Sequence, residues 1–284
     1  LVEGVEEPEQ TFGRPRLSLK ETVFCAVQKV YSQLSSRRAY SLFKNAETRS
    51  QIARAPNYNA INKLLNRADL TPLLHHLVGI TAQPLKAVET DFAIDSSGFR
   101  TTSFTEYAQT KYQLRREHRW LKAHICIGVK TNVVTGVEIT HENANDNLQF
   151  RPLVETTVKN GFAMREVSAD KGYSSRDNYE AVKEVGGQAF IPFRSNATGT
   201  SRGSRLWHKM FHYFQLNQEE FLEHYHKRSN VESTFNMIKQ KFGDKLKSKN
   251  PVAQKNELLC KIVAHNIVVL IHEMHELGIK PEFS

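Results

Sequence analysis

Two aspartates occupy similar places in this sequence, each at the end of an apolar segment. Residues 92–98 read FAIDSSG, so Asp95 stands where a strand-like run passes into small residues. Residues 166–173 read EVSADKGY, and Gly172 lets the backbone turn directly after Asp170. Sites in α/β sheets form where strands end, so both carboxylates are well placed to bind a ligand. Either aspartate alone could simply cap a turn. Together they favour a site.

A third acidic residue lies in a segment predicted to be helical, 218–241. At about 100° per residue, four polar residues fall within an arc of about 60° on one face of such a helix. They are Tyr225, Arg228, Glu232 and Lys239. The other side holds Val231, Ile238 and Phe242, which can face the protein. The stripe is suited to contact DNA, although a solvated charged face is the alternative.

The elements that must position these residues follow from periodicity and turn signals. Strands are predicted at 87–94, 123–130, 133–140, 164–169 and 188–192, the first three forming a meander. Helices are predicted at 147–159, 176–185, 218–241 and 251–277. The order β-β-β-α-β-α-β with closing helices matches a ribonuclease-H-like core: an α/β fold with a mixed five-stranded sheet flanked by helices.

The N-terminal part has a different sequence pattern. Residues 1–17 are rich in charge and turn formers, so we expect a tail or linker. Residues 18–84 are predicted to be helical, with Ser18 as the first N-cap and short helices at 39–43 and 58–65. This region fits a DNA-binding unit and a plain helical bundle equally well. Residues 85–278 form the α/β domain, with a short insertion at about 193–216.

Composition restricts the class of protein. The 284 residues include 39 lysines and arginines against 30 acidic residues, and the net charge of +9 favours a polyanionic partner. The three cysteines are far apart, which argues against a disulfide framework or a thiolate zinc site and favours a reducing compartment. The apolar run at 262–271 is too short for a membrane span, and no signal peptide is visible. The chain begins at Leu1, so we expect residues to be missing before it.

The motifs together resemble those of the DDE transposases of bacterial and archaeal insertion sequences. The last motif of that group is Tyr, two residues, Arg, three residues, Glu, six residues, Lys. Tyr225, Arg228, Glu232 and Lys239 meet this spacing in full. Asp95 in IDSSG and Asp170 in ADKGY match the first and second acidic motifs. The resemblance covers roughly residues 85–275.

The resemblance implies a function and a cofactor. In that family the three carboxylates hold two Mg²⁺ ions, for which Mn²⁺ can substitute, and hard cations do prefer carboxylate oxygens. The implied reaction is cleavage at transposon ends and strand transfer into target DNA. Tyr225, Arg228 and Lys239 are then expected to hold DNA phosphates near the scissile bond, and Lys171 is also expected to bind DNA. The implied partners are double-stranded DNA, with terminal inverted repeats and a target, and a second copy of the chain. The implied location is the prokaryotic cytoplasm, at the nucleoid, without a membrane.

The expected insertion leaves two hypotheses open for Trp207. Related transposases carry a subdomain here that holds a transposon end, in some cases with an aromatic residue that receives a flipped base, which makes Trp207 a candidate. Packing in a local core is the other interpretation. A series of lysines further on could likewise clamp DNA or form a solvated face: Lys239, Lys241, Lys245, Lys247 and Lys249.

Two other functions compete with a transposase. A metal-dependent nuclease or resolvase with the same core would share the carboxylates but would have no need of the Tyr-Arg-Glu-Lys stripe. A DNA-binding protein descended from a transposase would have lost activity, and the intact acidic set argues against that decay. A transposase is therefore the function we expect.

Overall fold

The computed structural model describes residues 17–101, 120–200 and 202–281. Within these ranges the chain forms two compact units. Unit 1 takes its described residues from 17–81, 99–101, 120 and 238–268, and unit 2 takes 82–98, 121–200, 202–237 and 269–281. The expected tail at 1–17 lies outside the described residues except for Leu17.

Unit 1 is helical. Its helices are α1 (Leu19–Tyr31), α2 (Ser36–Thr48), α3 (Tyr58–Leu65), α4 (Leu70–Ala82, except its last residue), the end of α10 (Ser229–Phe242) and the first two thirds of α11 (Pro251–Glu276). Ser18 caps α1 as predicted, since its Oγ accepts a hydrogen bond from the Glu21 N–H at 3.4 Å. Asn256 of α11 donates to the carbonyl oxygens of Leu65 and Arg67, both at 2.9 Å.

The two units divide the chain differently from the expected domains. The first boundary, at 81/82, lies close to the expected 84/85. Residues 238–268, expected in the α/β domain, instead belong with the N-terminal helices. The physical reason is a set of contacts between residues far apart in sequence, such as those of Asn256, which a linear pattern does not reveal.

Unit 2 is built on a sheet with the strand order β3-β2-β1-β4-β5. Its strands are β1 (Asp91–Arg100), β2 (Trp120–Gly128), β3 (Val134–His141), β4 (Glu166–Ala169) and β5 (Gln188–Phe190). The last residues of β1 and the first residue of β2 are assigned to unit 1. β2 and β3 are antiparallel, whereas β4 is parallel to both β1 and β5. The predicted α/β class with a mixed five-stranded sheet is therefore confirmed.

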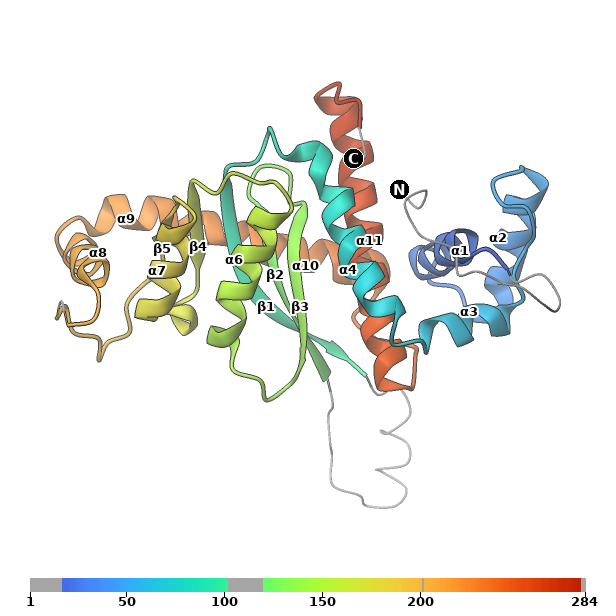
Figure 1. Cartoon of the computed structure of the whole chain (residues 1–284), viewed down its shortest axis with the longest axis horizontal. Helices are drawn as coiled ribbons and strands as arrows, with labels where there is room; N and C mark the ends of the chain where they lie inside the picture. The colour runs from blue at the N-terminus through green and yellow to red at the C-terminus, as the bar shows by residue number, and fades with distance from the viewer. Residues whose placement is uncertain (1–16, 102–119, 201, 282–284) are drawn as a thin grey trace, which may run out of the picture. The chain divides into compact units, whose positions relative to one another are not determined.

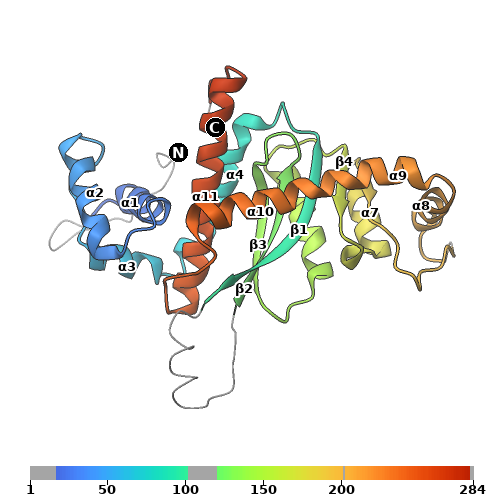
Figure 2. The same ribbon diagram turned by 180° about the vertical axis from the view of Figure 1, so that it is seen from behind.

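Helices lie on both faces of this sheet, as Figures 1 and 2 show from opposite sides. α6 (Phe150–Lys159) and α7 (Arg176–Glu184) cover one face, and α9 (Gln218–Tyr225) and the start of α10 cover the other. α8 (Arg205–Leu216) precedes α9. Short 3-10 turns complete the unit: η1 (Gln83–Leu85), η2 (Asp146–Gln149), η3 (Lys171–Tyr173) and η4 (His226–Arg228).

The two central strands have one apolar face and one polar face. Phe92 and Ile94 of β1 and Val167 and Ala169 of β4 belong to the core cluster. The alternate residues, which point to the opposite side of a strand, include an acidic pair at the start of the strands, since Asp91 lies opposite Glu166 in the parallel register. The acidic face is the one next to η4.

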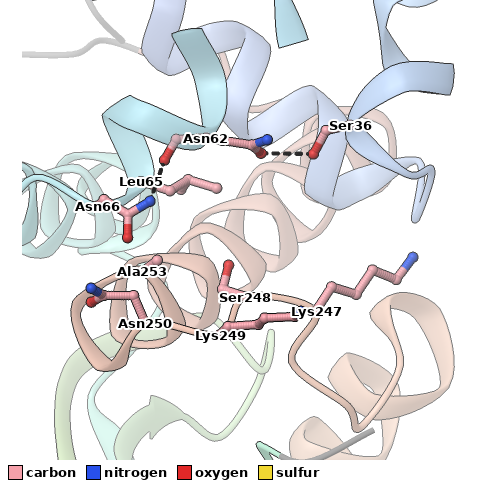
Figure 3. Close-up of a pocket in the computed structure, with 9 residues that line it drawn as sticks. All are labelled: Ser36, Asn62, Leu65, Asn66, Lys247, Ser248, Lys249, Asn250 and Ala253. Atoms are coloured by element: carbon pink, nitrogen blue, oxygen red, sulfur yellow. Dashed lines mark hydrogen bonds between the residues drawn. The ribbon is translucent and has the colours of Figure 1, made fainter. Parts of the chain in front are cut away.

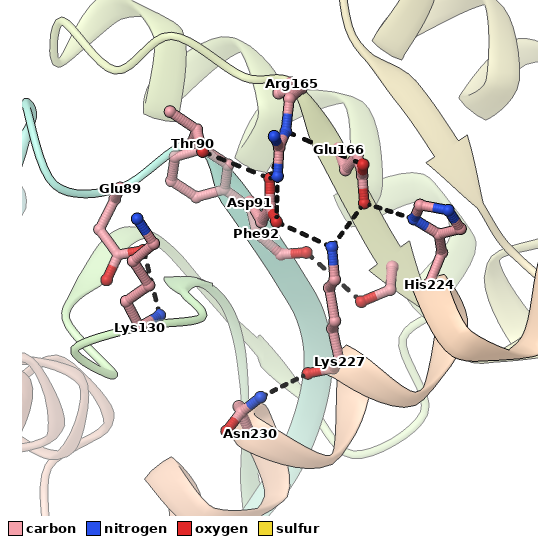
Figure 4. Close-up of polar contacts among 11 residues, drawn as sticks. Glu89, Thr90, Asp91, Phe92, Lys130, Arg165, Glu166, His224, Lys227 and Asn230 are labelled. Atoms are coloured by element: carbon pink, nitrogen blue, oxygen red, sulfur yellow. Dashed lines mark hydrogen bonds and ion pairs between the residues drawn. The ribbon is translucent and has the colours of Figure 1, made fainter.

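Lys227 of η4 bridges this acidic pair (Figure 4). Its Nζ lies 2.8 Å from both Asp91 Oδ2 and Glu166 Oε2. Arg165 forms a two-armed contact with Asp91 at 2.9 and 2.7 Å, and His224 Nδ1 lies 2.8 Å from Glu166. Burial alone would raise the pKa of Asp91, but the hydrogen bonds from Arg165 and Lys227 outweigh it and hold that pKa below its ordinary 3.8. The ion cluster thus attaches η4 to the sheet.

Another carboxylate, that of Glu89, holds the turn between β2 and β3. Its side chain is fully buried. It accepts hydrogen bonds from the Thr131 N–H at 2.6 Å, the Thr131 hydroxyl at 2.8 Å and the Lys130 N–H at 3.2 Å. The next residue, Asn132, has a positive φ of 63°, which asparagine tolerates. Glu89 therefore supplies the hydrogen-bond acceptor for these three donors of the turn.

By length and composition, α11 is the one described helix that could cross a membrane. However, 61% of its most apolar stretch is buried inside the structure, as in a core helix. Polar residues also lie on it: Asn266 is buried and donates to the Val78 carbonyl and to Thr81 Oγ1, each at 3.2 Å. The apolar side chains of α11 thus belong largely to the protein's own core.

Replacing Glu89 with alanine should lower the free energy of unfolding by about 3 kcal/mol, because three buried donors lose a charged acceptor. Chemical denaturation followed by circular dichroism measures this. Glu155→Ala is the matched control, since Glu155 is exposed and makes only a 3.6 Å surface pair with Arg151. Equal losses in the two variants would contradict the structural role of Glu89.

Asp91→Asn should lower the free energy of unfolding by about 2 kcal/mol at pH 7, because charge-assisted hydrogen bonds are lost. The folded-state pKa of Asp91 is depressed, so its stabilisation is present above the unfolded pKa and disappears as pH falls through the folded value. The difference in the free energy of unfolding between wild type and variant should therefore stay constant down to about pH 4. It should disappear as pH falls below 3.8, the ordinary pKa of an aspartate. Urea unfolding across this range measures it, and a gap independent of pH would show that packing, not charge, is responsible.

Candidate active site

Asp95 and Asp170 lie side by side on the polar face of the sheet. The last pair of the β1–β4 register is Ile94 with Ala169, and the next residue along each strand is one of the two aspartates. β4 ends at that point, whereas β1 continues to Arg100. The prediction that Asp95 ends its strand is therefore wrong: Asp95 lies in the middle of β1, where its neighbour stops. The prediction for Asp170, directly after β4, is confirmed.

The backbone after each aspartate binds its carboxylate. The Ser96 N–H donates to Asp95 Oδ1 at 2.8 Å, and the Lys171 N–H donates to Asp170 Oδ1 at 2.7 Å. Asp170 is the N-cap of η3, so its side chain also starts the turn that the sequence predicts at Gly172. In both residues one carboxylate oxygen, Oδ1, is held by the backbone N–H of the next residue.

The segment with Glu232 is not one helix. α9 ends at Tyr225, η4 follows, and α10 begins at Ser229, so the single helix predicted at 218–241 is wrong. The 3-10 turn changes the direction of Tyr225 and Arg228 relative to the helical stripe calculated for one regular helix. The apolar side of α10 is nevertheless buried as predicted, with Val231 fully covered.

Arg228 connects two of the three predicted carboxylates. Its Nη1 lies 2.5 Å from Asp95 Oδ2 and its Nη2 lies 2.5 Å from Glu232 Oε1. The side chains of Arg228 and Asp95 are 19% and 20% exposed, whereas Glu232 is 58% exposed. The guanidinium therefore stands between a shielded carboxylate on β1 and a solvent-facing one on α10.

The electrostatics show that the carboxylates lie within range of one another. Burial raises the pKa of Asp95, and the charges of Asp170 and Glu232 raise it further, while the Ser96 N–H and Arg228 oppose the rise. Burial would lower the pKa of Arg228, but Asp95, Tyr225 and Glu232 together outweigh it and raise that pKa. Burial therefore keeps the pKa of Asp95 above its ordinary value even with Arg228 in place.

This donor set fits a hard divalent cation. Three carboxylates from β1, the end of β4 and α10 offer the oxygen ligands that Mg²⁺ or Mn²⁺ prefers. Among the described residues, no three His, Cys, Asp or Glu side chains are gathered closely enough to hold a metal as they stand. Arg228 occupies the space between Asp95 and Glu232, which accounts for this spacing.

The other predicted DNA contacts lie at different places. Tyr225 ends α9 and lies within hydrogen-bonding reach of Arg228. Lys171 is exposed directly after Asp170. Lys239 lies further along α10, in unit 1, with its ammonium 5.2 Å from the centre of the Phe99 ring. Burial lowers the pKa of Lys239, and Asp244 opposes this shift.

Trp207 lies in an aromatic cluster, not in a position open to a base. It is 7% exposed, and its Nε1 donates to the Thr198 carbonyl at 2.8 Å. The rings of Phe193 and Tyr179 contact it edge-on, with centroids 4.7 and 5.7 Å away. Of the two hypotheses for Trp207, the structure shows the local core, and α8 accounts for half of the expected insertion.

Two polar contacts beside the aspartates were missed by the sequence analysis. Arg194 donates to the carbonyl oxygens of Lys171 at 3.3 Å and Gly172 at 2.9 Å, so it holds the turn after Asp170. Asp146 accepts from the Ser96 hydroxyl at 2.9 Å and from Lys122 at 2.5 Å. The available signals were weak: an arginine at the start of a loop and an aspartate just before a helix.

The lysine series lies in unit 1. Lys247 and Lys249 line a cavity of about 340 Å³ with seven other residues: Ser36, Asn62, Leu65, Asn66, Ser248, Asn250 and Ala253 (Figure 3). Lys247 Nζ also donates to the Gln33 carbonyl, and Lys241 lies 5.7 Å from the centre of the Tyr31 ring. Several of these lysines therefore make contacts within the unit, so an evenly solvated face is not what the structure shows.

Comparison with known proteins gives three similarities. The family model of the transposase DDE domain matches residues 86–267. An uncharacterized protein of Aquifex aeolicus (strain VF5) is 24% identical over 272 residues, covering 91% of this chain and 80% of that protein. Among solved structures, the cryo-EM structure of the piggyBac transposase synaptic complex with hairpin DNA has a TM-score of 0.46 and 10% identity, covering 99% of this chain and 72% of that chain. This last likeness is weak.

The family match extends over more than half of the chain and includes Asp95, Asp170 and Glu232. The chain therefore belongs to the transposase DDE domain family, whose members cut DNA with the help of divalent metal ions.

Proposed function

We propose that this chain is a transposase of a prokaryotic insertion sequence. It would cleave double-stranded DNA at the terminal inverted repeats of its element and join the freed ends to target DNA. The observation that carries this proposal is the position of Asp170 beside Asp95 and the link from Asp95 to Glu232 through Arg228, all within the segment that matches the family. A ribonuclease-H-like core agrees with the mixed sheet and the order of its strands. The enzyme would act in the prokaryotic cytoplasm, at the nucleoid.

The three carboxylates would hold two Mg²⁺ ions, or Mn²⁺ in their place. Such ions activate the attacking oxygen and stabilise the leaving oxygen of an in-line displacement. In cleavage, the oxygen of water bonds to phosphorus, the bond to the 3′ oxygen breaks, and that oxygen takes up a proton. In strand transfer, the freed 3′ hydroxyl replaces water as the nucleophile.

The residues around the carboxylates would hold the DNA. Arg228 can bind two phosphate oxygens with its planar guanidinium, whereas Lys171 and Lys239 act as point charges and Tyr225 as a hydroxyl donor. Such contacts position the phosphate and do not specify sequence. Because Arg228 is bonded to both Asp95 and Glu232 in the DNA-free chain, it must leave at least one of them to reach a phosphate. Two copies of the chain would be needed to bring two ends together.

Glu232→Gln should reduce the cleavage rate by more than about 100-fold. Loss of a residue that only supports a metal ligand costs up to about 100-fold, and Glu232 is expected to be a ligand itself. Binding of the terminal repeats should remain, since Glu232 makes no favourable contact with phosphate. The assay uses Mg²⁺ and DNA carrying the repeats that flank the coding region. Glu155→Gln is the control, because this residue is exposed on α6. Cleavage at the wild-type rate by the Glu232 variant would overturn the assignment.

The same assay separates the competing functions. Joined products support a transposase, nicking without joining indicates a nuclease, and binding without either reaction indicates a protein that has lost activity.

Arg228→Gln should change metal binding and cleavage in opposite directions. Without DNA, Mn²⁺ should bind more tightly, because the cation that competes for Asp95 and Glu232 is gone. Cleavage should fall, because a phosphate contact is lost. Calorimetric titration with Mn²⁺ measures the first effect. Arg228→Lys keeps the charge, and Arg151→Gln removes an exposed arginine paired with Glu184 as the control. Weaker Mn²⁺ binding by the Arg228→Gln variant would contradict this competition.

A further inference from the structure

Two successive residues of η4 contact two successive acidic positions of the sheet. Arg228 contacts Asp95, and Lys227, one residue earlier, bridges Asp91 and Glu166. Asp91 precedes Asp95 by four residues on β1, and Glu166 precedes Asp170 by four residues at β4, so both pairs follow the same register. Lys227 occupies none of the four positions of the Tyr-Arg-Glu-Lys motif.

The pair that Lys227 bridges needs a cation. Asp91 and Glu166 stand directly opposite each other on neighbouring strands, about 5 Å apart, where like charges destabilise a sheet. Their side chains are only 12% and 15% exposed, so water screens them poorly. Arg165 also contacts Asp91, but it is 64% exposed. Lys227, at 29%, is the more shielded cation and lies 2.8 Å from both carboxylates.

Lys227 is connected to the predicted metal ligands through the backbone. The Cα atoms of Lys227 and Arg228 are separated by a single peptide, about 3.8 Å. Asn230, in the first turn of α10, donates to the Lys227 carbonyl at 3.0 Å (Figure 4). Glu232 follows one helical turn after Arg228. A shift of Lys227 away from the strands would therefore displace both Arg228 and Glu232 from Asp95.

A second contact, on α10, also attaches the segment that contains Glu232 to the sheet unit. The Thr234 hydroxyl lies 3.2 Å from Asn132 Oδ1, in the turn that follows Thr131, and 2.9 Å from the Asn230 carbonyl oxygen, so its proton is shared between the two acceptors. Glu232 thus lies between two points at which its segment is attached to the sheet unit, Lys227 before it and Thr234 after it. Of these two, the ion bridge of Lys227 is the stronger, since charge-assisted contacts are about twice as strong as neutral ones.

We propose that Lys227 is a positioning residue, whose bridge between Asp91 and Glu166 sets the distance of Glu232 and Arg228 from Asp95 and Asp170. The proposal rests on the proposed function of those carboxylates. It assigns Lys227 no contact with DNA, because its ammonium is already bound by two carboxylates. The acidic pair at the start of the strands would then be as necessary to the site as the lysine.

The test uses the whole chain and three variants. Lys227→Met removes the charge with little change in length, Lys227→Arg keeps the charge, and the double variant Asp91→Asn with Glu166→Gln leaves Lys227 in place without its partners. Lys159→Met, on the exposed end of α6, is the matched control. Binding of Mn²⁺ alone is followed by electron paramagnetic resonance without DNA. Cleavage rate and DNA affinity are then measured separately, and thermal melting checks that each variant is folded.

Positioning predicts that Lys227→Met and the double variant share one defect. Mn²⁺ affinity should fall by about 10- to 100-fold in both, the range found when an outer partner of a metal ligand is lost. The cleavage rate should fall with it while DNA affinity stays unchanged, and Lys227→Arg should restore Mn²⁺ affinity. A DNA contact predicts the reverse: weaker DNA binding by Lys227→Met alone, with normal Mn²⁺ affinity.

Each result decides between these outcomes. Wild-type Mn²⁺ affinity in a folded Lys227→Met variant would overturn the proposal, as would an effect of Lys227→Met that the double variant does not share. If Lys227→Met fails to fold, the Mn²⁺ affinity of the double variant is compared with that of Lys227→Arg, and this comparison tests the proposal in the same way. Absence of metal-dependent cleavage by the wild type would instead overturn the proposed function, so the two failures are distinguishable.

Discussion

The parallel pairing of β1 with β4 is the constraint on which the site depends. Its register places Asp91 opposite Glu166 and ends at Ile94 with Ala169, so that Asp95 and Asp170 are the next residues along the two chains. Like charges on neighbouring strands repel, and partial burial strengthens the repulsion. A cationic segment must therefore lie across this face. η4 supplies Lys227, which contacts both Asp91 and Glu166, and Arg228, which contacts Asp95.

The helical region breaks at the residues that carry these cations. In the 3-10 turn η4, the consecutive residues Lys227 and Arg228 contact Asp91 and Asp95, acidic positions four residues apart on β1. Short 3-10 turns are frequent connectors between helices. Here the connector carries the cations that compensate the acidic face of the strands.

Much of the fold follows from local patterns. Alternating and continuous apolar runs indicated each of the five strands, and the cap at Ser18 and the helix at 58–65 agreed with the structure. The positions of Asp170 and of the buried side of α10 were also predictable, because both depend on short-range geometry. Asp95 was misplaced for a simple reason: small residues after it look like a loop, but β1 continues through them to Arg100.

Other features depend on contacts between distant residues. The assignment of residues 238–268 to the helical unit rests on pairs such as Asn256 with Leu65, which periodicity does not encode. The burial of Trp207 depends on Phe193 and Tyr179, which meet it only in the folded chain. The roles of Lys227 and Arg194 were hidden in the same way. Neither residue type nor spacing reveals which carboxylate or carbonyl a long cationic side chain will reach.

Arg194 gives the loop before α8 a significance beyond connecting two elements. Its guanidinium binds the carbonyl oxygens of the turn after Asp170, although Arg194 is among the first residues of the insertion expected at about 193–216. The later part of that stretch is held by its own aromatic cluster around Trp207. New sequence could therefore be accommodated between the two without disturbing the aspartate, which would let such a loop diversify while the chemistry beside it is preserved.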